Sequence, residues 1–201
     1  GKDRRIGPRD GFDLDWSPDG SQLAYVEWAI SGFGRPHGLI YVMRADGSGR
    51  SLLRTGTAGR DSSPSWSPAG NRIAYSTREN GRSSVYVIGL DGSHRRLLVT
   101  QARAPAWSPS GARIAYRTGC SGVRLVTPAG KDVTPPGRPV PCRAIGVSGV
   151  PVWSPDGRKI AVTTNKGIYV MDADGSDLTL VTTQTGKGII GTGRPTWRPL
   201  R

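Results

Sequence analysis

Trp153-Ser154-Pro155-Asp156-Gly157 is the stretch that decides the fold, because variants of it recur at a nearly constant interval. Earlier copies begin at Trp16, Trp66 and Trp107, and a degenerate fifth copy begins at Trp197. Consecutive tryptophans are separated by 50, 41, 46 and 44 residues. Self-similarity at such a period indicates a repeat architecture, in which each unit buries its faces against its neighbours.

The residues around this stretch divide into four short apolar runs that alternate with turns. A turn is predicted at residues 154–157, which contain Pro-Asp-Gly, and another at residues 172–176, which contain Asp-Gly-Ser. A tight hairpin loop is predicted at residues 165–167. The runs between them alternate and are rich in β-branched residues, as strands are. The strands of this repeat are therefore predicted at residues 150–153, 159–163, 168–171 and 178–182.

The three other complete repeats fit the same frame. Their second strands are predicted at 22–26, 72–76 and 113–117, their third strands at 39–43, 85–88 and 123–126, and their fourth strands at 51–54, 96–99 and the weak 132–134. No segment has the apolar spacing of an amphipathic helix. The sequence predicts an all-β fold of four-stranded antiparallel blades, the unit of a β-propeller.

The repeat covers nearly the whole chain, so we expect one domain after an N-terminal extension at residues 1–11. The predicted blades are residues 12–60, 61–103, 104–148 and 149–193, with the first strand of a fifth at 194–199. Both ends carry the same first-strand motif, so they duplicate each other instead of completing one blade. A partial or open ring is expected, whose exposed ends favour self-association. A closed four-bladed ring is the alternative.

Four linked motifs recur in the same order: Trp-Ser-Pro-Asp-Gly, Ile-Ala-Tyr, Ile-Tyr-Val-Met-x-x-Asp-Gly-Ser, and a leucine-containing strand. Together they resemble the TolB-like, WD40-like β-propeller repeat over about residues 12–199. The resemblance implies a non-enzymatic scaffold that binds proteins or peptides outside the cytoplasm, as a periplasmic or secreted protein of bacterial type. The alternative is the substrate-gating propeller of a larger enzyme, such as a prolyl-oligopeptidase-type serine peptidase.

In blades of this kind, the turns after the first and third strands lie on one face, which we call the uniform face. The loops after the second and fourth strands lie on the opposite, variable-loop face, where binding residues are expected. The longest loop between a second and a third strand spans residues 28–38, in the first blade. The candidate binding residues on the variable-loop face are Trp28, Phe33, Arg35, His37, Arg60, Arg78, Arg82, Arg103, Arg143, Lys187 and Arg194.

The net charge of +13 raises the question of a nucleic-acid partner. The 28 basic residues include 23 arginines, which are scattered through every repeat instead of forming a block. Dispersed charge is typical of a solvated surface, so an acidic protein or peptide partner is preferred over nucleic acid. No apolar run approaches the length of a transmembrane helix.

Cys120 and Cys142 are the only cysteines, and both are expected in variable loops of the third repeat. A disulfide between them is expected, which implies an oxidising compartment. Closing that loop would stabilise the fold by about 3 kcal/mol. Two separate buried thiols are the alternative.

No catalytic constellation emerges from the sequence, so no enzyme activity and no cofactor are predicted. The two histidines, His37 and His94, are expected on opposite faces, and the chain has no Gly-x-Ser-x-Gly nucleophile motif. Asp172, Asp174 and Asp177 could form an oxygen cage for calcium. A hairpin turn is preferred, because the same Asp-Gly-Ser recurs in two other repeats.

The tryptophans of the repeat are expected to pack in the core, because they occupy equivalent blade positions. Trp28 lies outside this pattern, in the long loop predicted at residues 28–38. It is interpreted either as a contact residue for a partner or as a cover for the edge of its own blade.

Overall fold

The computed structural model describes residues 11–30, 36–53, 59–118, 122–135, 149–164 and 166–183, together with Trp197. Every regular element within these residues is a strand, which confirms the all-β prediction. The strands are β1 (Gly11–Trp16), β2 (Gln22–Ile30), β3 (Pro36–Arg44), β4 (Ser51–Leu52), β5 (Arg60–Trp66), β6 (Arg72–Glu79), β7 (Arg82–Gly89), β8 (Arg96–Thr100), β9 (Ala102–Trp107), β10 (Ile114–Thr118), β11 (Val123–Val126), β12 (Val152–Trp153), β13 (Lys159–Thr164), β14 (Gly167–Asp172) and β15 (Thr179–Thr183).

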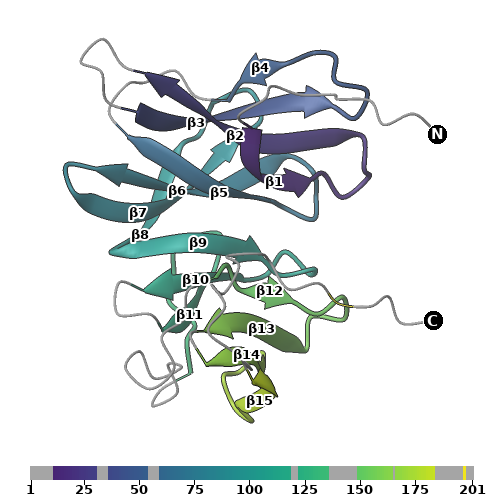
Figure 1. Ribbon diagram of the computed structural model, residues 1–201, viewed down its shortest axis with the longest axis vertical. Coiled ribbons are helices and arrows are strands. Elements are labelled where there is room, and N and C mark those ends of the chain that lie inside the picture. The colour runs from purple at the N-terminus through teal and green to yellow at the C-terminus, as the bar shows by residue number, and fades with distance from the viewer. Residues whose placement is uncertain are drawn as a thin grey trace.

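These strands form one antiparallel sheet for each predicted repeat, and the sheets follow one another from top to bottom of Figure 1. Three sheets have four strands in sequence order, β1 to β4, β5 to β8 and β12 to β15. The first strands of successive sheets contact one another, β1 with β5, β5 with β9, and β9 with β12. This arrangement is that of propeller blades, each of which follows the previous one around a shared inner edge.

The third sheet departs from the predicted frame, because it has three strands in the order β9, β10 and β11. The weak fourth strand predicted at 132–134 contributes only an isolated bridge between Val126 and Asp132. A side chain continues the ladder beyond this bridge, since Leu125 N donates a hydrogen bond to Thr134 Oγ1 at 2.9 Å. In the third repeat, an isolated bridge and a side-chain hydrogen bond therefore take the place of a fourth strand.

Several segments predicted as loops are strands. The loop predicted at 28–38 is wrong at both ends, because β2 continues to Ile30 and β3 begins at Pro36. The pairs Trp28–Gly38 and Ala29–His37 extend the ladder. In the same way, β5 begins at Arg60, one residue before the blade start predicted at 61. Strand β9 begins at Ala102, two residues before the blade start predicted at 104. Pairing satisfies backbone groups that a loop would leave to water.

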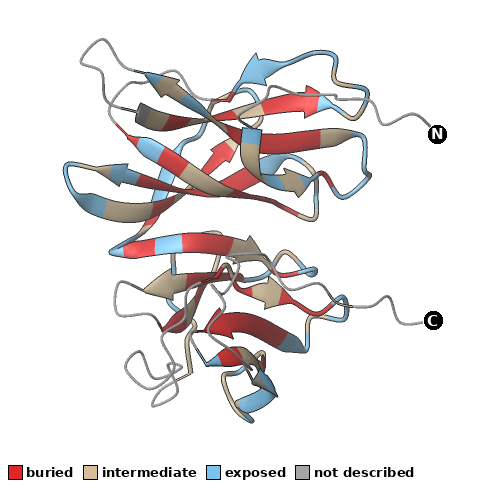
Figure 2. Ribbon diagram, viewed as in Figure 1, coloured by how far each residue is buried: buried red, intermediate tan, exposed pale blue. Residues whose placement is uncertain are grey.

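The apolar core lies between successive sheets, and Figure 2 shows buried residues along the facing strands. One cluster joins Val26 and Ile40 of the first sheet to Ile73 and Ile88 of the second. A second cluster joins the second sheet to the third, and a third cluster joins the third sheet to the fourth. Each blade is therefore stabilised by its neighbours, as the repeat pattern predicts.

The tryptophan of each motif packs against the preceding blade. Trp66 and Trp153 are only 5% and 8% exposed, and each belongs to the cluster shared with the blade before it. Trp16 has the same place in the motif but is 47% exposed, because no blade among the described residues precedes it. The prediction that the motif tryptophans are buried in the core is confirmed for Trp66 and Trp153 and is wrong for Trp16.

The indole groups also join consecutive blades by hydrogen bonds. Trp66 Nε1 donates to Asp15 O at 3.2 Å, and Trp153 Nε1 donates to Ala106 O at 3.0 Å. Trp197 Nε1 donates to Val152 O at 3.3 Å, so the degenerate fifth copy follows the same rule. In these three cases the acceptor is the carbonyl of the residue before the preceding motif's tryptophan, whereas the buried Trp107 Nε1 has no hydrogen-bond partner among the described residues. The repeat phrase thus encodes the contact between blades.

Candidate functional site

The uniform face is built from Ser-Pro-x-Gly turns that lie side by side. Each turn glycine packs near the proline ring of the preceding repeat's turn, as the pairs Gly70–Pro18, Gly111–Pro68 and Gly157–Pro109 show. The glycines adopt φ values from 70° to 73°, a conformation that L side chains rarely adopt. Each motif serine accepts a backbone hydrogen bond from the start of the second strand, at 2.8–3.1 Å. The face is consequently repetitive and rigid.

Two of these turns carry a carboxylate that holds the turn closed. In the first, Ser17 Oγ donates to Asp19 Oδ1 at 2.6 Å and Ser21 Oγ donates to Asp19 Oδ2 at 2.8 Å. Bonds from Ser17 and then Ser21 lower the pKa of Asp19 to about 2. The bond from Ser154 lowers the pKa of Asp156 in the fourth repeat by the same cause.

We expect the carboxyl of Asp19 to titrate near pH 2 in the folded chain. Since the folded pKa of Asp19 lies below the ordinary aspartate value of 3.8, the stabilisation that the carboxylate gives is complete above pH 3.8 and is lost as the pH falls toward 2. A side-chain carboxyl NMR titration measures the midpoint. Ser17→Ala should move the midpoint back toward 3.8, and a wild-type midpoint already at 3.8 would contradict the assignment.

An open groove of about 520 Å³ lies where the first strands end, on the side of the Ser-Pro-x-Gly turns. Its lining repeats from blade to blade and includes Trp66, Trp107, Trp153, Trp197, Pro68, Pro109 and Pro155. We call this the axial groove. Among the described residues that line it, Asp15 is the only acidic or basic one. The groove can therefore hold apolar groups, but its lining supplies no acid–base pair.

The variable-loop face carries cross-strand pairs of arginines. Arg60 at the start of β5 is directly opposite Arg78 near the end of β6. Arg103 in β9 is directly opposite Arg117 in β10. Arg82 begins β7 and pairs with Glu79 across the hairpin. Four of the predicted binding residues therefore lie in two neighbouring blades, on strand ends and not on the loops where the sequence placed them.

Arg117 is a residue that the sequence reasoning missed. It ended a predicted second strand at 113–117, and no loop signal marked it as a binding residue. Its place opposite Arg103 follows from a register shift in the pairing of β9 with β10. Burial, followed by the nearby charge of Arg103, lowers the pKa of Arg117.

Trp28 and His37 lie apart from these arginines in sequence, in the β2–β3 hairpin of the first blade. The Trp28 ring stacks on Phe12 of β1, with centroids 5.0 Å apart and planes at 26°. Trp28 thus covers the edge of its own blade, while 48% of its surface remains exposed. This contact favours the second of the two interpretations given for it. The remaining predicted binding residues and both cysteines lie outside the described residues, namely Phe33, Arg35, Arg143, Lys187, Arg194, Cys120 and Cys142.

His94 makes a contact that the sequence reasoning did not predict. Its Nδ1 lies 2.6 Å from Ser93 Oγ in the exposed turn after β7. Asp91 Oδ1 accepts a hydrogen bond from Ser93 N at 2.9 Å, so the carboxylate holds the serine's backbone and forms the turn. A catalytic triad requires a base that is oriented by the carboxylate and that faces the nucleophile. Within the described residues, Asp91 accepts its hydrogen bond from Ser93 and not from the His94 ring.

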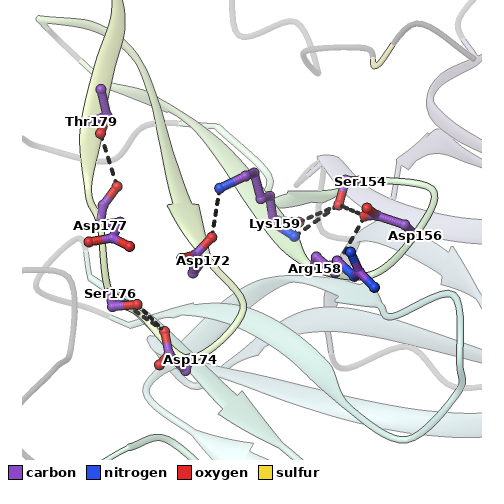
Figure 3. A network of polar contacts seen from close by, with 9 residues as sticks. All are labelled: Ser154, Asp156, Arg158, Lys159, Asp172, Asp174, Ser176, Asp177 and Thr179. Carbon is purple, nitrogen blue, oxygen red and sulfur yellow. Dashed lines mark hydrogen bonds and ion pairs between the residues drawn. The ribbon is translucent and has the colours of Figure 1, made fainter. Parts of the chain in front are cut away.

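Two of the three carboxylates considered for calcium, those of Asp172 and Asp174, are held by different partners, as Figure 3 shows. Asp172 Oδ1 accepts a bond from Lys159 Nζ at 2.7 Å, and Asp174 Oδ1 accepts one from Ser176 N at 2.8 Å. Asp177 has a φ of 52°, and its carbonyl accepts a bond from Thr179 Oγ1. Among the described residues, no group of three His, Cys, Asp or Glu side chains has a metal-binding arrangement.

The part of the chain that the structure describes contains no helix with the length and apolarity needed to cross a membrane.

Residues 12–127 match a family model described as the TolB beta propeller domain. Solved structures with the same arrangement include a protein assigned as TolB from Agrobacterium tumefaciens, with a TM-score of 0.68 and 21% identity. Others are TolB from Acinetobacter baumannii, with a TM-score of 0.66 and 18% identity, and a nidogen/laminin complex, with a TM-score of 0.65 and 11% identity.

The similarity covers most of this chain but a smaller share of the solved proteins. It covers 83%, 87% and 82% of this chain, and 63%, 44% and 61% of the three matched chains, in the order given above. At these identities the structural likeness shows the fold. The family model matches more than half of the residues and coincides with the first blades, so this chain belongs to the TolB beta propeller domain family.

Proposed function

We propose that this chain is a non-enzymatic scaffold that binds a protein or peptide segment on its variable-loop face. The observation that carries the proposal is the set of exposed arginines at the strand ends of two adjoining blades, Arg60 and Arg78 in one and Arg103 in the next. Within the described part of the chain, no hydrogen bond or ion pair engages these three guanidinium groups. A location outside the cytoplasm, periplasmic or secreted, is part of the same proposal and is supported by membership of the TolB family.

The scaffold beneath this face supports such a role. The blades are joined through buried tryptophans, and the candidate residues stand on paired strands instead of long connections. Binding groups held on rigid elements lose less conformational entropy when a partner docks. The uniform face has the opposite character, because its polar side chains are used to close the turns.

An unbiased peptide library displayed against the chain tests this function. We expect enriched peptides that compete for one site and that keep their affinity, within about twofold, when Arg72 and Arg113 are changed together to glutamine. These two exposed arginines stand at the beginning of the second strands, next to the Ser-Pro-x-Gly turns. The proposal fails if no peptide is enriched, or if the enriched peptides lose binding to R72Q/R113Q.

A further inference from the structure

Each of the two cross-strand arginine pairs places two positive charges directly opposite each other in an antiparallel ladder. Residues directly opposite each other in an antiparallel ladder have Cα atoms about 4.5–5.5 Å apart, and like charges in such a pair are destabilising. Arg60 opposite Arg78, and Arg103 opposite Arg117, repeat this arrangement in two consecutive blades. An anion placed between the two guanidinium groups of a pair would turn that repulsion into attraction.

The two pairs stand on adjoining blades. Ala104 N, next to Arg103 in sequence, donates a hydrogen bond to Ser76 Oγ at 2.7 Å, and Ser76 stands two residues before Arg78 on β6. This bond places the start of β9 next to the end of β6. Arg103 and Arg117 lie on the face of the third sheet that turns toward the fourth, the face of Val123. We call the four residues Arg60, Arg78, Arg103 and Arg117 the arginine strip.

Nearby carboxylates are committed to other partners. Glu79, the residue after Arg78, accepts a bond at 3.2 Å from Arg95, whose Nε also donates to Tyr75 OH at 2.7 Å. The Arg95 guanidinium stacks over the Tyr86 ring at 3.7 Å. The first blade repeats this clamp, with Arg50 bound to Glu27 and stacked on Tyr41. Because the clamp engages Glu79, this carboxylate is not paired with the neighbouring Arg78.

The strip offers charge without an aromatic surface beside it. Among the described residues of the second and third blades, Leu97 is the only large apolar side chain that is exposed. Proteins that bind single-stranded nucleic acid combine a basic groove with aromatic platforms for the bases. Carboxylate groups need only the guanidinium donors. The observations therefore favour an acidic peptide over a nucleic acid.

We infer that the exposed arginines of the arginine strip, Arg60, Arg78 and Arg103, bind a run of carboxylate side chains in an acidic peptide. The inference rests on the proposed function and names the chemistry of its partner. The Arg60–Arg78 pair receives one carboxylate and Arg103 receives another, whereas the partly buried Arg117 adds positive charge opposite Arg103.

Fluorescein-labelled hexaglutamate is the probe, and its affinity for the chain is measured by fluorescence anisotropy at low salt. We expect saturable binding that weakens about tenfold in R60Q/R103Q and changes less than about twofold in R72Q/R113Q. Each variant removes one exposed arginine from the second blade and one from the third, so their net charges are equal. Equal melting temperatures for both variants and the wild type establish that folding is unaffected.

Each other outcome overturns the inference. Equal losses in both variants would show attraction to net charge alone, and undetectable binding would show that no acidic-peptide site exists. Tighter binding of a labelled oligothymidylate, lost in R60Q/R103Q, would assign the strip to nucleic acid. If hexaglutamate fails while library-selected neutral peptides bind the variable-loop face, the inference fails and the proposed function stands. If no peptide of any kind binds, both fail.

Discussion

Replacing Trp66 with alanine is expected to lower the free energy of unfolding by about 3–5 kcal/mol, the usual cost of removing a buried aromatic side chain. Trp66 is 5% exposed and packs in the cluster that joins the first two blades. The substitution also removes the indole hydrogen bond to Asp15 O. Urea unfolding followed by circular dichroism measures the change, with the slope of the transition checked for constancy.

Trp16→Ala is the matched control, because it removes the same side chain from the same place in the motif. Trp16 is 47% exposed and has no preceding blade among the described residues. We expect its loss to cost about 1 kcal/mol or less, in the range of exposed substitutions. Equal costs for the two variants would contradict the claim that each motif tryptophan stabilises the chain through the preceding blade.

Replacing Gly167 with alanine is expected to cost about 3 kcal/mol, as the sum of backbone strain and overpacking. Gly167 has a φ of 138°, and a Cβ there would collide with the carbonyl oxygen of Thr182 on β15. Because Gly167 and Thr183 are paired in the ladder, the strands cannot separate without losing hydrogen bonds. Thermal unfolding without urea measures the effect, and the melting temperature of Gly167→Ala should be several degrees below that of the wild type.

Gly81→Ala separates strain from collision. Gly81 occupies the corresponding hairpin of the second blade, with a φ of 79° and no atom within 4 Å of an added Cβ. Only the backbone strain remains, so we expect a cost of about 1 kcal/mol. If Gly81→Ala destabilised the chain as much as Gly167→Ala, the close approach of β14 and β15 would be wrong.

The sequence was sufficient to predict the three four-stranded sheets and the first three strands of the other sheet, because each strand pairs with its neighbour in the chain and each turn carries its own proline or glycine. Local chemistry of this kind is present in every repeat, as in Ser67–Gly70. The exposure of Trp16 was not anticipated, because its motif is identical to that of the buried Trp153. Only the position of a blade within the array distinguishes the two residues.

The candidate site was predicted less completely than the fold. Loop lengths placed Arg60 and Arg103 on the correct face, but they lie on strands, since pairing continues past the predicted strand ends. The opposition of Arg103 to Arg117 depends on a register shift in the β9–β10 ladder. Such a shift follows from the conformation of Ala104, whose φ is 54°, and a sequence pattern does not encode it.

Family membership is consistent with this division between scaffold and site. The TolB beta propeller match spans residues 12–127, which include the motif turns and the core strands of the first blades. The arginine pairs belong to the face where the repeats differ in length and composition. Function on a repeated scaffold is set by such grafted residues, and the fold alone does not specify it.

Amide hydrogen exchange of the chain, with and without a library-selected peptide, tests the central claim most directly. The account predicts slower exchange at the beginnings of β5 and β9 and in the hairpin between β6 and β7, with no change in the Ser-Pro-x-Gly turns. Protection of those turns or of the residues that line the axial groove, with the arginine-bearing strand ends unchanged, would contradict it.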